Sequence, residues 1–519
     1  MIPSNLGELL TESARKYPHR TALVFGSKKI SYAHLDELTT RIARGLAAQG
    51  IAKGDRIAIF LDNCPEFVIS YYSILKSGAT VIPINYMFKV EEARFILQDS
   101  GACGIVTARA YLDMAKELRL RVDTLKHIFC CHEPGSHQGI TSFEHLKKHD
   151  HAFVTPALKP EDLAVILYTS GTTGHPKGAM LSHFNLISNA SDCRKALSPL
   201  GPRDTFICIL PLFHSFAATV CMNLPLLLGA KIVMMKSVRP FKRVIRAIRN
   251  NRVSIFVGIP SIYTVLKNTK LPRILHTPLI RLLNPVRICV SGAAALPPET
   301  LKSFEKKFRV ALVEGYGLTE ASPVVTLNPI RGIRKPGSIG LCLSDSMQLR
   351  VVDEHGRDVE SGKAGELLVK GPNVMAGYYR QPEESALALK DGWLYTGDMV
   401  RIDKQGYVYI CGRKKEMVNV RGLNVYPREI EEVLYLNPKV KEAAVIGIAD
   451  PHKGEVPKGF VVLQDGQAAT EHEMIRFLRD RLAPYKVPKA IEFRRSLPKN
   501  TTGKILKRIL QDEENSKAA

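Results

Sequence analysis

No segment of the sequence is apolar over a length that could cross a bilayer. A membrane-spanning helix needs about 20 apolar residues in succession. The longest apolar stretch, Ala217–Ala230, is interrupted by Asn223 and Pro225. The N-terminal sequence MIPSNLGELL also lacks the basic-then-apolar pattern of a secretory signal. We therefore expect a soluble, cytoplasmic protein.

The sequence also lacks the cysteine spacing of a zinc site. Its ten cysteines include no CxxC pair, which argues against a structural zinc site and against a redox motif. Several of them, including Cys208, Cys221 and Cys289, lie in apolar contexts that are typical of buried reduced thiols. Their distribution favours a reducing compartment.

Acidic residues are missing from one long segment. Between Lys236 and Arg287 there are twelve Lys and Arg residues and no Asp or Glu, in a chain of net charge +23. A helix over 239–252 would gather apolar side chains on one face, namely Phe241, Val244, Ile245 and Ile248. A solvated basic face that steers anionic ligands is the favoured interpretation, and peripheral contact with an anionic membrane stays open. Without interleaved aromatic residues or a recognisable module, no nucleic-acid partner is expected.

The length and the pattern of elements predict an α/β fold with more than one domain. A chain of 519 residues exceeds what a single hydrophobic core usually serves. Residues 1–160 alternate helical patterns, such as Leu6–Tyr17 and Tyr32–Gln49, with short apolar strands such as Arg56–Phe60. A β-rich segment follows at Gly337–Gly365, and a compact α/β unit begins near Pro427.

The most informative stretch is Tyr168–Gly178, which reads YTSGTTGHPKG. It follows an apolar strand pattern, Leu163–Leu167, and precedes a helical pattern that starts at Ser182. Glycines let successive backbone N–H groups point at one anion, and hydroxyl groups with one lysine suit phosphate oxygens. This predicts a phosphate-binding loop, although an ordinary turn would use many of the same residues. It is not a Walker A motif, because Gly178 follows Lys177 where that motif needs Ser or Thr.

Four further motifs follow in order: SGAAA at 291–295, EGYGLTE at 314–320, WLYTGD at 393–398, and a glycine-bounded loop around Lys504. Small residues at a strand end let a flat ring approach the backbone. One carboxylate together with phosphate oxygens suits magnesium, and an acid at a strand end can accept ribose hydroxyls. Taken singly, each motif could equally be a turn, a solvated acid or an exposed lysine.

In this order the motifs resemble those of the acyl-adenylate-forming enzymes, and most closely those of fatty acyl-CoA synthetases. The resemblance runs from the first helix to Arg508. It implies a large N-terminal domain, 1–413, of β-sheets flanked by helices plus a β-rich subdomain, and a small mobile α/β lid domain, 414–519. Lys415 corresponds to the hinge between them.

The resemblance also implies roles for particular residues. It places phosphates on Ser170, Gly171, Thr172, Thr173, Gly174 and Lys177. It places adenine at Gly292, Ala293, Ala294, Glu314, Gly315, Tyr316 and Gly317, and ribose at Asp398 and Arg413. It assigns catalytic roles to His214, Thr319, Glu320 and Lys504, and magnesium to Glu320 and Thr172. From the residues alone, His214 between phenylalanines would be a packed core side chain.

The implied activity is ATP-dependent ligation of a fatty acid to coenzyme A through an acyl-AMP intermediate, with Mg²⁺. Two apolar segments, Ala217–Leu228 and Ile255–Leu266, would line the acyl tunnel. The alternatives are an aryl-CoA ligase, a fatty acyl-AMP ligase, or an inactive nucleotide- or lipid-binding protein on the same scaffold. Acyl length is not legible from the sequence, and the protein could be a monomer or a homodimer.

Overall fold

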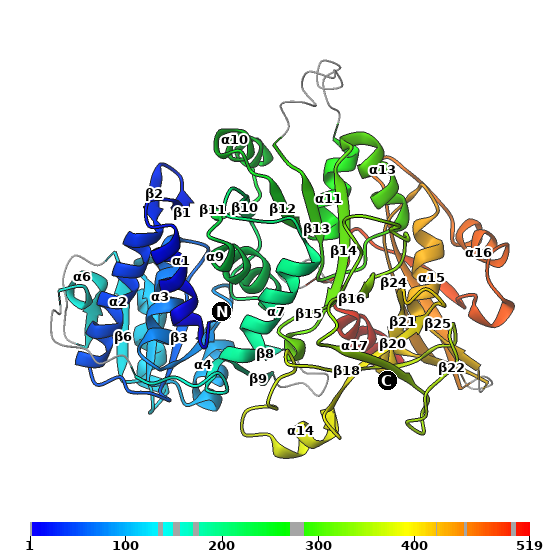
Figure 1. Cartoon of the computed structure of the whole chain (residues 1–519). Coiled ribbons are helices and arrows are strands. Elements are labelled where there is room, and N and C mark those ends of the chain that lie inside the picture. The colour runs from blue at the N-terminus through cyan, green and yellow to red at the C-terminus, as the bar shows by residue number, and fades with distance from the viewer. Residues whose placement is uncertain are drawn as a thin grey trace.

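We describe a computed structural model of the chain, shown in Figure 1. The structure describes residues 3–132, 139–148, 156–169, 176–269, 285–421, 423–450, 454–499 and 505–518. Within these residues lie four β-sheets with helices packed around them. The mixed α/β architecture, with a large N-terminal part and a smaller C-terminal part, confirms the predicted fold class. The predicted boundary, 413/414, falls between strand β21 and the short helix η5.

One N-terminal sheet has seven strands in the order β7-β6-β5-β3-β4-β8-β9, parallel except for the last pair. Its strands are β3 (Arg56–Phe60), β4 (Thr80–Pro83), β5 (Gly104–Ala108), β6 (His127–Cys131), β7 (Ile140–Ser142), β8 (Leu163–Thr169) and β9 (Lys177–Ser182). The helices of this region are α4 (Val90–Ser100), α5 (Leu112–Arg121) and α6 (Phe143–Leu146). The strand predicted at Arg56–Phe60 is confirmed with the same bounds.

A second sheet has nine strands in the order β16-β15-β14-β13-β12-β10-β11-β1-β2. They are β1 (Thr21–Phe25), β2 (Lys28–Ser31), β10 (Thr205–Cys208), β11 (Lys231–Met234), β12 (Ile255–Gly258), β13 (Ile288–Ser291), β14 (Ala311–Gly317), β15 (Val324–Leu327) and β16 (Leu341–Cys342). Its helices include α7 (His183–Ala196), α10 (Phe241–Asn251), α11 (Pro260–Asn268) and α13 (Pro298–Phe308).

The two large sheets share one hydrophobic core. Every residue of α3 (Pro65–Lys76) is buried, and this helix contacts both β3 of the seven-stranded sheet and β1 of the nine-stranded sheet. The predicted helices at the N-terminus are confirmed as α1 (Leu6–Lys16) and α2 (Tyr32–Ala48), which pack against it. Such continuous burial over both faces explains why α3 carries almost no exposed polar side chain.

A five-stranded antiparallel sheet forms the predicted β-rich part. It contains β17 (Gln348–Val352), β18 (Gly365–Lys370), β19 (Leu389–Lys390), β20 (Trp393–Ile402) and β21 (Val408–Arg413), with helix α14 (Pro382–Ala388) beside it. The connection η5 (Lys414–Glu416) leads from β21 into the last sheet.

The C-terminal sheet combines β22 (Val418–Val420), β23 (Leu423–Val425), β24 (Val440–Asp450), β25 (Gly454–Leu463) and β26 (Ala490–Phe493). Helices α15 (Pro427–Tyr435), α16 (Glu471–Arg479) and α17 (Lys507–Ala518) belong to this part. The compact α/β unit predicted to begin near Pro427 is confirmed, since α15 begins at that residue. In Figure 1 this part lies on the opposite side of the molecule from α1–α6.

Two local features go beyond what the sequence patterns specified. The predicted helix at Ser182 is confirmed as α7, which begins at His183, but the residues before it form a strand, β9, which pairs antiparallel with β8. Tertiary pairing with β8 extends the backbone there. On α10, Val244 is buried, but Ile245 is 52% exposed, so the apolar stripe is not wholly covered. Among the described residues, no helix is both long and apolar enough to traverse a bilayer.

Candidate active site

Lys177, at the start of β9, lies in a charged and aromatic setting. Its backbone faces Thr169 across the β8–β9 hairpin. Its ammonium forms an ion pair with Glu384 of α14 and lies 5.3 Å from the centre of the Tyr378 ring. The lysine side chain is only 12% exposed. An incoming phosphate would therefore compete with Glu384 for this cation. The other predicted loop residues, Ser170, Gly171, Thr172, Thr173 and Gly174, lie outside the described residues.

Glu320 lies in the same neighbourhood. It occupies the short helix η4 (Thr319–Ala321), which follows β14. The Tyr378 hydroxyl donates a 2.9 Å hydrogen bond to Glu320 Oε1, and the Met375 N–H donates one of 2.9 Å to the Glu320 carbonyl oxygen. Burial and the charge of Glu320 raise the pKa of Tyr378, so its hydroxyl stays a donor. Tyr378 thus connects the predicted phosphate-binding cation to the predicted magnesium ligand.

The backbone explains how Tyr378 reaches this position. Residues 376–379 run along the free edge of β9: Met180 donates to the Gly377 carbonyl at 2.9 Å, and Tyr379 donates to the Gly178 carbonyl at 2.8 Å. Tyr378 itself forms an antiparallel bridge with Ala179. Tyr378 and Glu384 were not predicted, because nothing in GYYRQPEE marks a segment that pairs with β9, a distant part of the sequence.

His214 and Thr319 approach one another through Ser215. His214 caps the start of α8 (Ser215–Ala217), and the hydroxyls of Ser215 and Thr319 are 3.3 Å apart. The His214 ring lies 4.4 Å from that of Phe213. Burial lowers the pKa of His214 to about 4, so the imidazole is neutral near pH 7. His214 therefore stays a neutral polar side chain and does not gain or lose a proton near pH 7.

The predicted ribose residues form a hydrogen-bonded chain. Asp398 on β20 and Arg413 on β21 are direct partners in the sheet. Arg413 Nε lies 2.7 Å from Asp398 Oδ1, and the Tyr316 hydroxyl donates a 2.5 Å hydrogen bond to Asp398 Oδ2. Asp398 is 3% exposed. A carboxylate has about four lone-pair sites, so Asp398 can hold both neighbours and still accept from a ligand hydroxyl.

The segments predicted to hold adenine end neighbouring parallel strands. Ser291 on β13 is paired with Glu314 on β14, which brings Gly292, Ala293 and Ala294 beside Gly315, Tyr316 and Gly317. A side chain at Gly292 would come within 2.8 Å of the Phe216 ring, and one at Gly317 within 2.0 Å of the Pro323 carbonyl oxygen. Both positions therefore need glycine for close packing. Phe216 is a further neighbour that the sequence analysis did not single out.

Glu314 differs from its neighbours because it is 2% exposed. Its Oε1 accepts a 2.9 Å hydrogen bond from the Leu296 N–H, whereas Oε2 has no partner among the described residues. Burial raises the pKa of this carboxyl to about 7. It is therefore a buried acid whose ionised form is costly.

The remaining predicted residues lie beyond β21. Lys415 is exposed in η5, two residues after Arg413, and its neighbour Lys414 forms a 2.7 Å ion pair with Glu366 of β18. Lys504 lies outside the described residues. The residues on either side of its loop, Lys499 and Ile505, form an antiparallel bridge.

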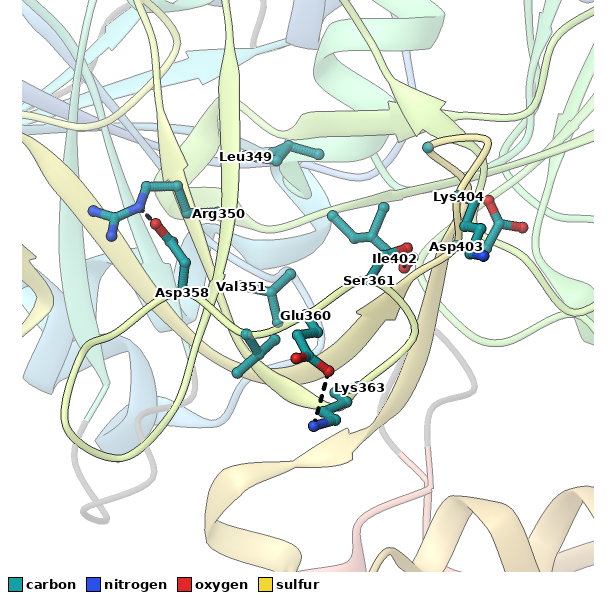
Figure 2. Close-up of a pocket in the computed structure, with 12 residues that line it drawn as sticks. Leu349, Arg350, Val351, Asp358, Glu360, Ser361, Lys363, Ile402, Asp403 and Lys404 are labelled. Atoms are coloured by element: carbon teal, nitrogen blue, oxygen red, sulfur yellow. Dashed lines mark hydrogen bonds and ion pairs between the residues drawn. The ribbon is translucent and has the colours of Figure 1, made fainter.

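A depression of about 730 Å³ lies elsewhere, between β17 and the end of β20 (Figure 2). Charged residues line it, and several are paired with each other: Arg350 with Asp358 at 2.8 Å and Lys363 with Glu360 at 3.0 Å. None of the predicted site residues lines it. Because most of its charged side chains are already paired and it contains none of the predicted residues, we do not regard it as the active site.

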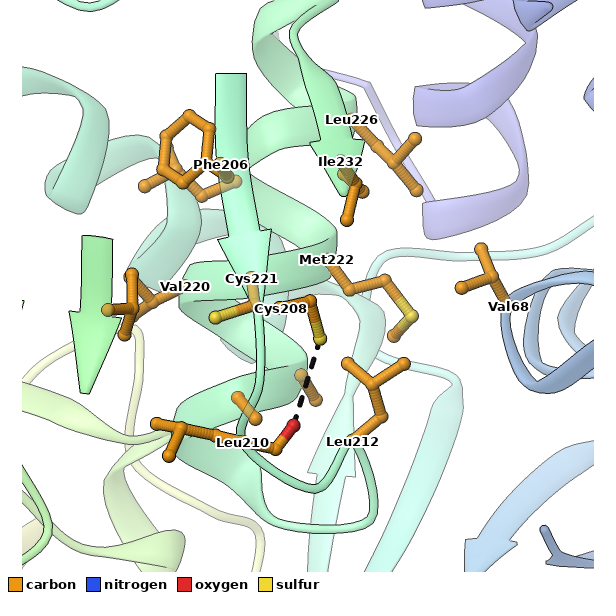
Figure 3. Close-up of a cluster of buried hydrophobic side chains, with 14 of the residues drawn as sticks. Val68, Phe206, Cys208, Leu210, Leu212, Val220, Cys221, Met222, Leu226 and Ile232 are labelled. Atoms are coloured by element: carbon orange, nitrogen blue, oxygen red, sulfur yellow. Dashed lines mark hydrogen bonds between the residues drawn. The ribbon is translucent and has the colours of Figure 1, made fainter. Parts of the chain in front are cut away.

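The first predicted acyl-tunnel segment contributes to a packed cluster (Figure 3). Residues Ala218–Asn223 form a π-helical turn, η2, followed by α9 (Leu224–Leu228). Val220, Cys221 and Met222 are buried in the core that also contains Cys208 of β10 and Val68 of α3. No Asp, Glu, Lys or Arg occurs between 217 and 228. π-Helical turns are rare and occur frequently at functional sites.

The fold and the site together define a class: a two-part α/β protein in which a cation, an acid and a Tyr–Asp–Arg chain lie near the connection between the parts. Comparison with known proteins narrows that class. The family of AMP-binding enzymes matches residues 10–379, and the AMP-binding enzyme C-terminal domain matches residues 429–504. The chain belongs to this family of AMP-binding enzymes.

Similar proteins share nearly the whole length of the chain. A long-chain-fatty-acid–CoA ligase of Bacillus subtilis is 37% identical over 98% of this chain and 94% of its own. The crystal structure of ATP-bound MatB from Rhodopseudomonas palustris has 33% identity and a TM-score of 0.88, covering 98% of both chains. That of the anthranilate CoA ligase AuaEII with anthranoyl-AMP has 27% identity and a TM-score of 0.91, covering 100% of this chain and 98% of the other.

Proposed function

We propose that this protein is an ATP-dependent fatty acid–CoA ligase. The observation that carries the proposal is the presence of two polar groups of predicted site residues: Lys177 and Glu320, which both contact Tyr378, and the Tyr316–Asp398–Arg413 chain. It occurs in a chain that is 37% identical to a long-chain-fatty-acid–CoA ligase over nearly its full length.

The chemistry requires two steps at one carbonyl carbon. A carboxylate does not accept a thiolate, because it is anionic and has no adequate leaving group. In the first step a carboxylate oxygen attacks the α-phosphorus of ATP, the bond to the β-phosphate oxygen breaks, and pyrophosphate leaves with its electrons. In the second step the thiolate of coenzyme A attacks the acyl carbon, and AMP leaves.

The first step brings two anions together, so the residues must position and neutralise them. Lys177 binds the outer phosphates after it separates from Glu384. Asp398 and Arg413 hold the ribose, and Tyr316 lies against the base. Lys504 contacts the carboxylate and the α-phosphate. His214 and Thr319 border the reacting centre without exchanging protons near pH 7.

The residues present suit Mg²⁺. Glu320 offers a partly exposed carboxylate whose orientation is fixed by Tyr378. Magnesium is commonly held by one or two carboxylates with substrate phosphates, and Thr172 of the phosphate loop supplies a hydroxyl. The ion neutralises charge on the phosphates when it is bound.

The second step uses the connection at η5. Reorientation of the C-terminal part about Lys415 withdraws Lys504 and admits the thiol of coenzyme A. The boundary 413/414 that we propose for the two domains lies at this connection. The protein acts as a monomer or a homodimer in the cytoplasm.

Fatty acids are favoured over aromatic acids by the uncharged segment 217–228, whose aliphatic and sulfur side chains suit an alkyl chain. An aryl-CoA ligase is the second candidate, because an anthranilate CoA ligase has a TM-score of 0.91 to this structure. A fatty acyl-AMP ligase would carry out the first step alone.

Carboxylate-dependent exchange of pyrophosphate into ATP separates these candidates. The assay is run with palmitate, octanoate, benzoate and anthranilate, and coenzyme A is then added. We expect exchange and thioester with the fatty acids. Exchange without thioester would indicate an acyl-AMP ligase, and preference for the aromatic acids an aryl-CoA ligase. If the parent protein shows no more exchange with any acid than the Lys504→Ala variant does, an enzymatic function of this kind is refuted.

A further inference from the structure

The amphipathic helix α10 carries a cluster of cations that pair with no carboxylate in the described part of the chain. Six exposed basic side chains lie on it or immediately beside it: Arg239, Lys242, Arg243, Arg246, Arg249 and Arg252. None of these six forms an ion pair with a described carboxylate. We call these six residues the α10 cluster.

The absence of ion pairs around α10 contrasts with other charged helices of the same protein. On α4 and α5, for example, Arg94 and Arg121 each pair with Glu91 at 2.8 Å. The basic residues at the two ends of the acid-free segment are paired, unlike those of α10: Lys236 pairs with Asp62 at 3.1 Å, and Arg287 pairs with Asp204. Mutual repulsion in the α10 cluster is therefore not relieved within the described structure.

An apolar side chain accompanies these charges. Val244 is fully buried and anchors α10 to the nine-stranded sheet, while Ile245, the next residue, is 52% exposed. Lys242 and Arg246 lie one turn or less from Ile245 on the same helix. A helix that presents basic residues around an exposed aliphatic side chain has the composition of a membrane-surface helix.

The position of α10 in the fold is also informative. It connects β11 to β12, and so lies between the segment that contains η2 and the segment 255–266 in the chain. In Figure 1 it lies on the periphery of the nine-stranded sheet, with α11 beside β12 and β13. The Tyr316–Asp398–Arg413 chain belongs to other elements, namely β14, β20 and β21.

We propose that the α10 cluster and Ile245 form a docking surface for an anionic phospholipid bilayer. Each Lys or Arg near such a surface contributes about 1 kcal/mol of electrostatic attraction. Ile245 enters the boundary between headgroups and acyl chains. Nucleic acid fits less well, because no aromatic side chain is exposed on the described part of α10 to stack on bases. The proposal does not depend on the ligase activity, since it concerns a surface outside the site.

The test measures co-sedimentation of the full-length protein with vesicles of phosphatidylcholine, alone or mixed with phosphatidylglycerol. We expect binding only to the mixed vesicles and weakening by salt. The variant Lys242→Gln/Arg243→Gln/Arg246→Gln/Arg249→Gln should lower the partition coefficient on the order of 100-fold. Ile245→Ser should lower it by about 5-fold while keeping its salt dependence. All five side chains are exposed, so the thermal midpoint should be nearly unchanged.

A matched control removes the same charge elsewhere. Arg357→Gln/Lys363→Gln/Lys370→Gln/Lys404→Gln changes four exposed cations of the five-stranded sheet region, where Asp353, Asp358 and Glu360 are interspersed. It should leave vesicle binding within about 3-fold of the parent. Equal loss in the control, equal binding to both vesicle types, or no binding by the parent would each overturn the proposal. Retention of RNA without retention of mixed vesicles would overturn it in favour of a nucleic-acid surface.

Discussion

The proposed nucleotide side and the proposed acyl side of this protein are built in different ways. On the nucleotide side, Tyr316, Asp398 and Arg413 come from three strands and are joined by directional bonds of 2.5 and 2.7 Å. On the proposed acyl side, η2 is packed mainly through apolar and sulfur side chains such as those of Cys221 and Met222. Two hydrogen bonds add to this packing: Thr219 donates to the Ser322 carbonyl at 3.1 Å, and the Tyr72 hydroxyl donates to Asn223 Oδ1 at 3.0 Å. Directional bonds require particular residue types, whereas apolar packing accepts many. The proposed nucleotide side therefore depends on particular residue types, whereas the proposed acyl side depends mainly on the shape of its packed surface.

The largest effect should come from a substitution of Asp398, the carboxylate that joins Tyr316 and Arg413. Asp398→Asn leaves Arg413 and Tyr316 without their shared carboxylate, so acid-dependent pyrophosphate exchange should fall by about 100-fold or more. Asp403→Asn is the matched control, because Asp403 pairs with Lys335 just after β20 and outside the chain of three. Similar losses in both variants would contradict the special position of Asp398.

A smaller effect should follow from changes at Glu320, the proposed magnesium ligand, and at its neighbour Tyr378. Glu320→Gln should raise the Mg²⁺ concentration needed for half-maximal exchange by about 100-fold, and Tyr378→Phe by about 10-fold, because Tyr378 only orients the carboxylate. Tyr379→Phe, which removes the adjacent hydroxyl, serves as the control. The measurement is the Mg²⁺ dependence of kcat/KM. A larger effect for Tyr378→Phe than for Glu320→Gln would reverse the assigned roles.

On the proposed acyl side, substitutions of two buried methionines distinguish an effect on stability from an effect on acid specificity. Met222→Ala in η2 and Met234→Ala in β11 each remove a core side chain, and each should lower the free energy of unfolding by about 2–4 kcal/mol. Only Met222→Ala should also shift the preferred acid length, by roughly 10-fold in the ratio of kcat/KM for palmitate and octanoate. If both variants shift it equally, η2 does not line the acyl site.

The smallest effect concerns the buried acid between the two sides. Burial raises the folded-state pKa of Glu314 to about 7 from an ordinary 4.5. The folded state therefore binds more protons than the unfolded state between these values, and stability falls as pH rises through that window. Glu314→Gln should raise stability by about 2 kcal/mol at pH 8 and change it little at pH 4.

Thermal unfolding of the ligand-free protein at both pH values measures this difference. Glu305→Gln is a suitable control, because Glu305 is a partly exposed acid on α13 whose Oε1 likewise accepts a backbone N–H, that of Leu312. A gain at pH 8 that equals the gain at pH 4 would show that the carboxyl of Glu314 is already neutral or well solvated.

Much of the fold was predictable because the local patterns agreed with the tertiary structure. The strand Arg56–Phe60 and the helices near the N-terminus follow directly from apolar periodicity. The strand β9 was missed because its pairing with β8, rather than its own composition, decides its conformation. In the same way, the exposure of Ile245 depends on how far the nine-stranded sheet extends beneath α10, which helical periodicity does not specify.

For the candidate site, the motifs identified the participants but not their bonds. Asp398 and Arg413 were both predicted, yet their pairing across β20 and β21 and the hydroxyl of Tyr316 on the same carboxylate come only from the structure. Glu384 and Tyr378 escaped prediction because their role depends on a chain segment that returns to β9 from a distant part of the sequence. Whether the predicted residues perform their proposed roles is a question for the variants above.

One consequence follows from the closeness of Arg413 to η5. The guanidinium that fixes Asp398 is separated from the exposed backbone of Lys415 by a single residue. Torsion about that backbone would swing everything downstream through a wide arc, while the anchor point itself stayed almost stationary. In the proposed reorientation about Lys415, a pivot so near Arg413 would let the C-terminal part change its orientation while the contact between Arg413 and Asp398 is kept.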